Sequence, residues 1–245
     1  MVLGLSSALA KAGMDVTILT TDSNGDVGQA PLDVPLEVPI QQEGYEIYYF
    51  RCSPFRRYKF SLNLLNWLAK NAQNYDLAHI HALFSPVSSF SAKVARSQHL
   101  PYILRPLGTL DPADLQKKKA LKKLYAAFLE KPNLASASGV HFTSDREAKT
   151  SERFGAITND LVIPLGVKLP LSQSISIREK YGIPGDRPML LFLSRIEPKK
   201  GLDLLIPALE ALLEHEFQFV LAGSNPQDPE YEQQIRERVQ RSRLN

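Results

Sequence analysis

The chain has 245 residues, of which 44% are hydrophobic and 22% charged, and its formal net charge is +3. This composition is that of one large or two modest globular domains, not of a disordered chain. Because Cys52 is the single cysteine, an intrachain disulfide and a cysteine-rich metal cluster are excluded. No apolar run approaches the roughly 20 residues that a membrane-spanning helix needs, and the N-terminus lacks a signal-peptide pattern. We therefore expect a cytoplasmic protein.

Short apolar strands alternate with helices along the first two thirds of the chain. The expected helices cover residues 2–12, 62–71, 87–97, 113–129 and 145–154. The expected strands cover residues 15–20, 45–50, 77–81, 102–104, 139–143 and 161–164, and residues 22–44 read as loop. This alternation is typical of an α/β protein with a parallel sheet covered on both faces. Since a helix that leads into a buried strand normally follows an earlier strand, this first domain is predicted to lack its initial strand.

A second domain is predicted after a proline-rich segment at 168–188, which reads as a linker. We place the domains at 1–168 and 169–245. Strands are expected at 189–193 and 217–223, and the pair Asp228-Pro229 suits the start of a last helix. Two strands are too few for a complete doubly wound domain, so this domain is predicted to be incomplete. Pro207 is expected to bend the helix between the two strands or to shift its start.

A basic turn follows the first strand of this second domain. The turn holds Arg195 and Lys200, and Gly201 opens a segment with helical spacing of its apolar residues. A helix N-terminus flanked by two cations is suited to a phosphate or pyrophosphate, since an arginine can grip two oxygens and a lysine acts as a point charge. Two solvated loop cations would give the same spacing.

Three other positions in the first domain are candidates for a ligand site. His81 ends a strand where ligand loops gather in open parallel sheets, whereas His79 is expected on the other side. A core or loop role is the alternative for both histidines. The pair is a weak candidate for a metal site, because no third ligand is evident nearby. Gly108 and Gly166 would permit close backbone approach to a ligand, although tight turns explain glycine equally well.

A lysine-rich segment adjoins an apolar stripe in the expected helix 113–129. The lysines are Lys117, Lys118, Lys119, Lys122 and Lys123, and the apolar residues are Leu121, Leu124, Tyr125 and Phe128. Attachment to anionic lipid is one interpretation, with about 1 kcal/mol from each lysine near the surface. A solvated helix face is the other. A nucleic-acid partner is not expected, because no aromatic stacking platform accompanies the charge.

Several segments, taken in order, resemble landmarks of the retaining glycosyltransferases of family 4. The segments are 5–21, 76–81, 105–112, 162–167, 194–201 and 220–223. The resemblance implies the GT-B architecture: two Rossmann-like domains, with a nucleotide sugar bound mainly by the second and an acceptor held by the first. It places on the donor side Gly166, Arg195, Lys200 and Gly201, and on the acceptor side His81, Gly108 and Thr109.

The resemblance further implies an enzyme that transfers a hexosyl group from a nucleoside-diphosphate sugar, with retention and without a metal. Arg195 and Lys200 would stabilise the departing diphosphate. The nucleotide sugar is a co-substrate, and no separate cofactor is expected. The other partner would be a glycan or a lipid-linked acceptor in polysaccharide or glycoconjugate biosynthesis, which agrees with a peripheral position at the inner face of the membrane.

The sequence also departs from the family's pattern. Leu107 stands where the family usually carries a histidine, and neither the glycine-rich loop after the first strand nor the late pair of glutamates is found. We therefore expect a fragment that is poorly stable and inactive alone. A non-catalytic, degenerate GT-B-like binding protein or relic is the alternative. A nicotinamide-dependent oxidoreductase is disfavoured, because no G-x-G-x-x-G turn with a following acid occurs.

Overall fold

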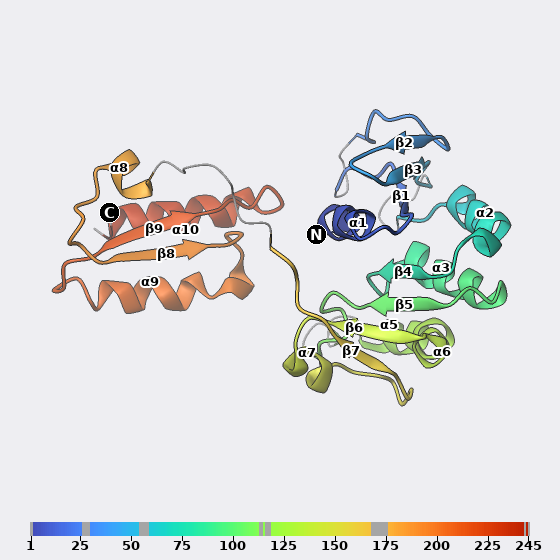
Figure 1. The fold of residues 1–245 in the computed structure, drawn as a ribbon. Helices are drawn as coiled ribbons and strands as arrows, with labels where there is room; N and C mark the ends of the chain where they lie inside the picture. Colours follow the sequence, from blue (N-terminus) through green and yellow to red (C-terminus); the bar gives the residue numbers. More distant parts are fainter. Residues whose placement is uncertain are drawn as a thin grey trace. The chain divides into compact units, whose positions relative to one another are not determined.

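A computed structural model describes residues 2–25, 30–53, 59–112, 115, 119–167, 176–242 and 244. The chain divides into two compact units, Met1–Lys168 (unit 1) and Leu169–Asn245 (unit 2), which are coloured from blue to yellow and from yellow to red in Figure 1. Among the described residues, no helix has the length and apolar character to cross a bilayer.

Unit 1 alternates strands and helices, as the sequence predicts. Its strands are β1 (Thr17–Thr21), β2 (Pro39–Gln41), β3 (Glu46–Phe50), β4 (Ala78–His81), β5 (Tyr102–Arg105), β6 (Gly139–Phe142) and β7 (Asp160–Val162). Its helices are α1 (Val2–Lys11), α2 (Leu62–Asn71), α3 (Pro86–Ser97), α5 (Lys119–Tyr125), α6 (Lys131–Ser136) and α7 (Asp145–Thr150), with a 3-10 turn η2 (Ala72–Asn74) and a π-helical turn η3 (Ala126–Glu130).

The strands of unit 1 form two sheets. In the first, β1 pairs with β3 in parallel and β2 pairs with β3 in antiparallel orientation; in the second, β4, β5, β6 and β7 are all parallel. Figure 1 shows these strands in the spatial order β2, β3, β1, β4, β5, β6 and β7. Among the described residues β1 pairs only with β3, and β4 only with β5. The sheet is therefore interrupted at its centre, in agreement with the expected lack of the initial strand.

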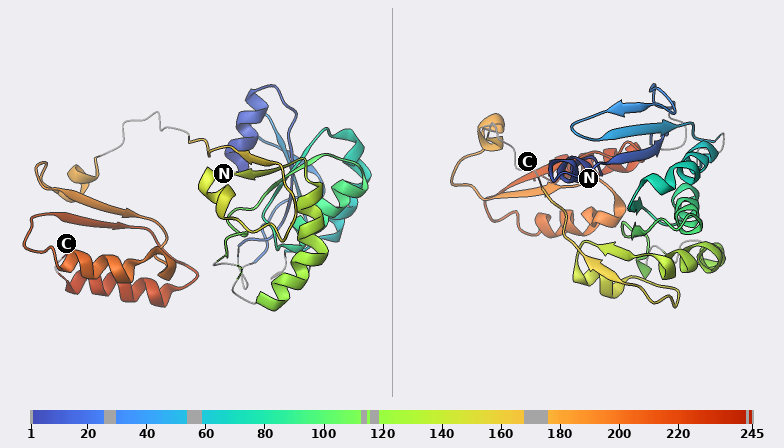
Figure 2. Two further views of the ribbon diagram at one scale, coloured as in Figure 1. Left: turned by 90° about the horizontal axis from the view of Figure 1, so that it is seen from below. Right: turned by 45° about the vertical axis from the view of Figure 1, so that its right-hand side comes forward.

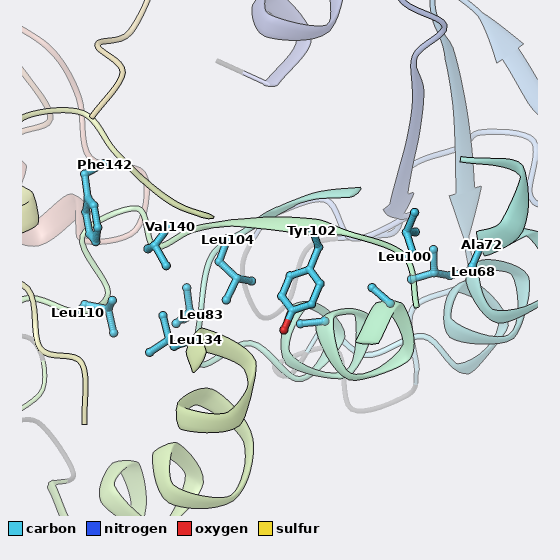
Figure 3. Packing of buried hydrophobic residues seen from close by; sticks show 12 residues of the cluster. Leu68, Ala72, Leu83, Leu100, Tyr102, Leu104, Leu110, Leu134, Val140 and Phe142 are labelled. Carbon is cyan, nitrogen blue, oxygen red and sulfur yellow. The ribbon is translucent and has the colours of Figure 1, made fainter. Parts of the chain in front are cut away.

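The core of unit 1 lies on one face of the four-stranded sheet. Tyr102 and Leu104 of β5 and Val140 and Phe142 of β6 are each at most 2% exposed. They belong to one buried cluster with Leu134 of α6, which Figure 3 shows, and with the alanines of α3. Because side chains alternate along a strand, Ile103 of β5 and His141 of β6 face the opposite side of the sheet.

A buried carboxylate holds the loop after β4 against the helices of unit 1. Glu130, which is 1% exposed, accepts hydrogen bonds from the backbone N–H of Phe84 (2.6 Å) and the hydroxyl of Ser89 (2.7 Å) through Oε1. The hydroxyl of Tyr125 donates to Ser89 Oγ at 2.8 Å. Burial raises the pKa of Glu130. This network fixes the loop that leaves the carboxyl end of β4.

Unit 2 is a strand pair covered on one face. The elements are α8 (Ile177–Tyr181), β8 (Met189–Leu193), the 3-10 turn η4 (Pro198–Lys200), α9 (Leu202–Glu210), β9 (Gln218–Ala222) and α10 (Pro229–Arg241). The two strands are parallel and in register from Met189–Gln218 to Leu193–Ala222. Helices α9 and α10 lie on one side of the strand pair (Figure 2) and share a buried core with Phe219. Two strands agree with the expected incomplete second domain.

Some expected bounds are wrong for local reasons. Residues 22–44, expected as loop, contain β2, which is a strand because its backbone pairs with β3. The expected linker contains α8, which ends where Gly182 adopts a left-handed conformation and its N–H bonds the helix carbonyls. Helix α7 stops at Thr150, because Ser151 is extended and its hydroxyl bonds a helix carbonyl.

Two further helix expectations have mixed outcomes. The helix expected at 113–129 lies partly outside the described residues, and its described part passes through the π turn η3 into α6. Helix α9 starts at Leu202 and contains Pro207 in its interior, so the proline does not shift the start of the helix.

Candidate functional site

The basic turn of unit 2 starts where the carboxyl ends of β8 and β9 meet. Gly223, directly after β9, has φ +150°, and a Cβ atom there would be 1.8 Å from the carbonyl oxygen of Ser194 and 2.9 Å from its carbonyl carbon. Ser194 N–H donates to Ala222 O at 3.2 Å. Glycine is therefore required at position 223 for this close approach, which fixes the backbone leading to Arg195.

Arg195 does not stand free in this turn, because Glu197 contacts it. Arg195 Nη2 is 3.1 Å from Glu197 Oε2, and Lys199 Nζ is 3.4 Å from Glu197 Oε1. The side chains of Arg195 and Lys199 are 53% and 59% exposed, so both ion pairs are solvent-screened and contribute about 0–1 kcal/mol. A weak pair of this kind can open when a stronger anion binds. The sequence interpretation missed Glu197, although it lies only two residues from Arg195.

Lys200 and Gly201 connect this turn to helix α9. Lys200 is exposed at the end of η4 and forms no ion pair with any residue that the structure describes. Gly201 follows with φ 71° and ψ 27°, a left-handed conformation, and is the N-cap of α9 without a side-chain cap. Arg195, Lys200 and Gly201 thus share one turn at a helix N-terminus, where the dipole favours an anion.

A charged network supports the neighbouring loop after β9. Glu232 accepts from the backbone N–H of Asn225 at 2.5 Å and from Arg236 Nε at 2.8 Å, while Arg236 Nη2 donates to Gly223 O at 2.6 Å. The N–H of Asn225 and then Arg236 lower the pKa of Glu232. Helix α10 therefore anchors the glycine on which the position of the basic turn depends.

A polar face covers the other side of the sheet in unit 1, near the carboxyl ends of β4, β5 and β6. His79 and His81 have ring centroids 4.5 Å apart, and His79 and His141 have centroids 5.4 Å apart. Arg105 pairs in register with His81. The expectation that His79 faces the other side from His81 is wrong, because side chains two residues apart in a strand share a face.

His79 and His81 are buried enough to lose their charge. Burial lowers the pKa of His79 to about 4, with smaller contributions from His81, His141 and Arg105. Burial, followed by Arg105 and His141, lowers the pKa of His81 to about 4. Both rings are therefore neutral near pH 7. No group of three metal-ligating side chains is found among the described residues.

The loops after β4 and β5 have strained backbones. Ala82 (φ 70°) and Phe84 (φ 56°) follow β4, and Leu107 (φ 58°) precedes Gly108 (φ 77°) after β5. Left-handed conformations of non-glycine residues cluster at functional sites. The Thr109 hydroxyl donates to a backbone carbonyl within its own turn at 2.7 Å. His81, Gly108 and Thr109 thus lie at the ends of two neighbouring strands.

Gly166 lies on the exposed segment after β7, and nothing lies within 4 Å of where its Cβ would be. The structure gives no steric reason for glycine at this position, and its role in donor binding stays a prediction. Sequence reasoning gave no role to Arg105 or His141. Their signal was polar residues within apolar strands, which alone does not reveal their burial.

Two family models match the chain. The model described as "Glycosyl transferase 4-like domain" matches residues 1–166, and that described as "Glycosyl transferases group 1" matches residues 173–245. Among curated relatives, the D-inositol 3-phosphate glycosyltransferases of Xylanimonas cellulosilytica and Kineococcus radiotolerans are 26% and 24% identical over 91% and 86% of the chain. The chain spans 57% and 51% of the length of these relatives.

Solved structures share the fold. Sucrose-phosphate synthase from Thermosynechococcus elongatus matches 100% of this chain and 62% of its own, with a TM-score of 0.65 and 20% identity. HepE from Anabaena, solved in complex with UDP and glucose, matches 83% of this chain and 54% of its own, with a TM-score of 0.60 and 19% identity. The first family model covers more than half of the sequence, and the chain belongs to the family-4-like glycosyltransferases with the GT-B fold.

Proposed function

We propose that the chain is the part of a retaining glycosyltransferase that binds a nucleoside-diphosphate sugar through the basic turn after β8. The observation that supports this most directly is that one turn holds three suitable groups: half-exposed Arg195, Lys200, which forms no ion pair with a described residue, and the start of α9, whose N-cap is a glycine. The solved HepE complexes, with UDP and with UDP-glucose, are structures of a protein with the same fold.

The chemistry follows from where charge develops. When the bond between the sugar carbon and the diphosphate breaks, negative charge grows on the departing oxygens. Arg195 can leave Glu197, which holds it only weakly, and can grip two of those oxygens, while Lys200 adds a point charge. These contacts strengthen as the bond breaks, so they lower the barrier without a metal or a separate cofactor. The acceptor hydroxyl then attacks from the face that the diphosphate leaves and gives its proton to the departing phosphate oxygen, so the configuration of the sugar is retained.

The acceptor in this proposal is a glycan or a lipid-linked sugar in polysaccharide or glycoconjugate synthesis. One relative with 28% identity over 56% of the chain is described as a putative teichuronic acid biosynthesis glycosyltransferase from Bacillus subtilis. His81, Gly108 and Thr109, at the carboxyl ends of β4 and β5, would lie on the acceptor side. The alternative of a non-catalytic, degenerate binding protein stands on Leu107, which replaces the family's usual histidine with an apolar side chain.

A matched pair of lysines provides the test. UDP binding to the 245-residue chain is measured by calorimetry for the wild type and for the variants Arg195→Ala, Lys200→Ala and Lys199→Ala. Loss of a charge-assisted contact costs about 1.5–3 kcal/mol, so the first two variants should bind UDP about 10- to 100-fold more weakly. Lys199→Ala removes the same charge from a lysine that Glu197 already holds and should bind within about twofold of wild type. Equal affinities of the Lys199 and Lys200 variants would contradict the proposal.

We further propose a peripheral contact with the inner face of the membrane through α5 and η3. Leu121, Leu124 and Phe128 are 65%, 59% and 74% exposed, a concentration of apolar side chains that water does not favour. Lys122 and Lys123 lie beside them; Lys117 and Lys118 lie outside the described residues, as does the side chain of Lys119.

This membrane contact is tested by pelleting with phosphatidylserine vesicles at low and high salt. We expect binding at low salt that falls as salt rises, and weaker binding when Phe128 is changed to serine. A matched change of Leu212, which is 44% exposed in unit 2, should have no effect. Equal pelleting of wild type with neutral and anionic vesicles would contradict the proposed contact.

A further inference from the structure

Arg105 is a buried cation that contacts no counter-ion among the residues described by the structure. It is the last residue of β5 and only 2% exposed, and neither Nε nor Nη2 has a hydrogen-bond partner among the described residues. Glu147 acts on Arg105 electrostatically, but its Oε2 accepts from both the N–H and the hydroxyl of Thr143 at 2.7 Å. A buried guanidinium in this state is costly unless an anion completes it.

The two unpaired atoms of Arg105 belong to the same edge of the guanidinium. Nε–H and one Nη2–H point in parallel, and this edge binds two oxygens of a carboxylate or phosphate at once. The geometry of the free edge therefore selects an oxyanion over a neutral hydroxyl, which can fill only half of it. It also disfavours a metal ion, which the positive charge repels.

His81 supplies a further polar atom next to Arg105. The two residues are directly paired between β4 and β5, and Nδ1 of His81 is likewise buried without a hydrogen-bond partner in the described part of the chain. His81 as a residue is only partly buried, so this end of the sheet is not fully closed to solvent. In its neutral form one ring nitrogen donates, which lets His81 Nδ1–H bond an oxyanion beside the arginine.

The other two histidines hold this pair in place. His141 Nε2 lies 2.9 Å from the carbonyl of Ile163, and since a carbonyl only accepts, Nε2 carries the hydrogen. His141 Nδ1 lies 3.4 Å from His79 Nε2, so the two rings are partners of one another. These contacts hold His79 and His141 within the protein, whereas Nδ1 of His81 and the Nε and Nη2 atoms of Arg105 have no partner among the described residues.

We infer that Arg105 and His81 form a subsite for an anionic group, a phosphate or a carboxylate, carried by the sugar that accepts the glycosyl group. The identification of the ligand as the acceptor rests on the proposed function. The subsite itself lies within unit 1 and does not depend on the basic turn. The ligand is an anionic sugar, because a neutral sugar lacks the oxyanion that would accept hydrogen bonds from Nε and Nη2 of Arg105.

Three sugars of similar size test the inference on the 245-residue chain. Glucose 6-phosphate carries a phosphate, glucuronate a carboxylate, and glucose neither. Binding is measured by calorimetry at matched ionic strength, and the ring nitrogens of His81 are followed by NMR. We expect at least one anionic sugar to bind at least about tenfold more tightly than glucose and to shift His81 Nδ1; the stronger of the two identifies the group.

Variants of Arg105 test whether binding needs the two parallel N–H groups of the guanidinium or only its positive charge. Arg105→Gln should lose about tenfold or more in affinity for the anionic sugar, and Arg105→Lys should lose most of it as well, because an ammonium cannot bind two oxygens in parallel. Arg146→Gln is the matched control: it makes the same arginine-to-glutamine substitution on the exposed face of α7 and should not change the affinity for the anionic sugar. If Arg105→Gln does not fold, Arg105→Lys and the partly exposed His81→Asn decide the question.

Glucose binding as tightly as both anionic sugars, or Arg105→Lys and His81→Asn binding like wild type, would overturn the subsite. UDP binding is measured on the same samples and should be unchanged by these substitutions. If the proposed function is wrong, the wild type will not bind UDP, or the Arg195 and Lys200 substitutions will not weaken UDP binding. If the subsite is wrong, only the affinities for the three sugars will differ from expectation.

Discussion

Replacing Gly223 by alanine should destabilise unit 2 more than any other single methyl group added to a glycine of that unit. The new Cβ would lie 1.8 Å from the carbonyl oxygen of Ser194, a backbone atom that cannot rotate away. Crowding of this kind costs about 1–3 kcal/mol, and the left-handed side of the backbone map costs a non-glycine residue about 1–3 kcal/mol more. The expected loss of about 2–6 kcal/mol is a large share of the stability of a small unit.

Hydrogen exchange resolves this effect, whereas fluorescence does not. Trp67, the single tryptophan, lies in unit 1, so its emission does not report on β8 and β9. In Gly223→Ala, amides in peptides covering these strands should exchange at least about 30-fold faster, since about 1.4 kcal/mol corresponds to a factor of ten. Gly185→Ala is the matched control in the same unit, because nothing lies within 4 Å of its Cβ position. Similar exchange in the two variants would refute the argument.

Two further predictions concern pH. Burial raises the folded-state pKa of Glu130, so its favourable contribution is present below its unfolded pKa and is lost as pH rises through the folded-state pKa. Glu130→Gln does not titrate, so it should gain stability relative to wild type as pH rises above 4.5, by about 1.4 kcal/mol for each unit of the shift. Urea unfolding followed by Trp67 fluorescence measures this, and a constant difference would contradict it. The N–H of Asn225 and Arg236 lower the pKa of Glu232, so its contribution is present at neutral pH and lost as pH falls; Glu232→Gln should accelerate exchange in α10 at neutral pH but not in acid, and equal acceleration at both would count against the network.

Much of the fold follows from hydrophobic periodicity. Strands such as β5 and β6 are short apolar runs between turn residues, and their alternation with helices predicts the parallel sheet. The pattern fails where structure depends on partners distant in the chain. Strand β2 has three residues with one half-buried side chain, and only its backbone pairing with β3 makes it a strand. Helix α8 is a single turn ended by Gly182, which a proline-rich segment conceals.

The candidate site was partly predictable for the same reason. The basic turn is contiguous in sequence, so Arg195, Lys200 and Gly201 could be assigned to it together. The ion pairs of Glu197 depend on the conformation of the turn and were missed. Arg105 and His81 come together only through the register of two strands, and a sequence does not report that a guanidinium edge lacks a partner.

The interruption between β1 and β4 has a consequence for how these molecules behave in concentrated solution. Within the described part of the chain, each of the two strands has one edge that pairs with no other strand, and its row of backbone amides and carbonyls is a template for an extended segment of another molecule. Thr17–Thr21 is rich in β-branched residues, which favour such pairing. Self-association should therefore start at this seam and rise with protein concentration, and a charged residue placed at Thr20 should suppress it.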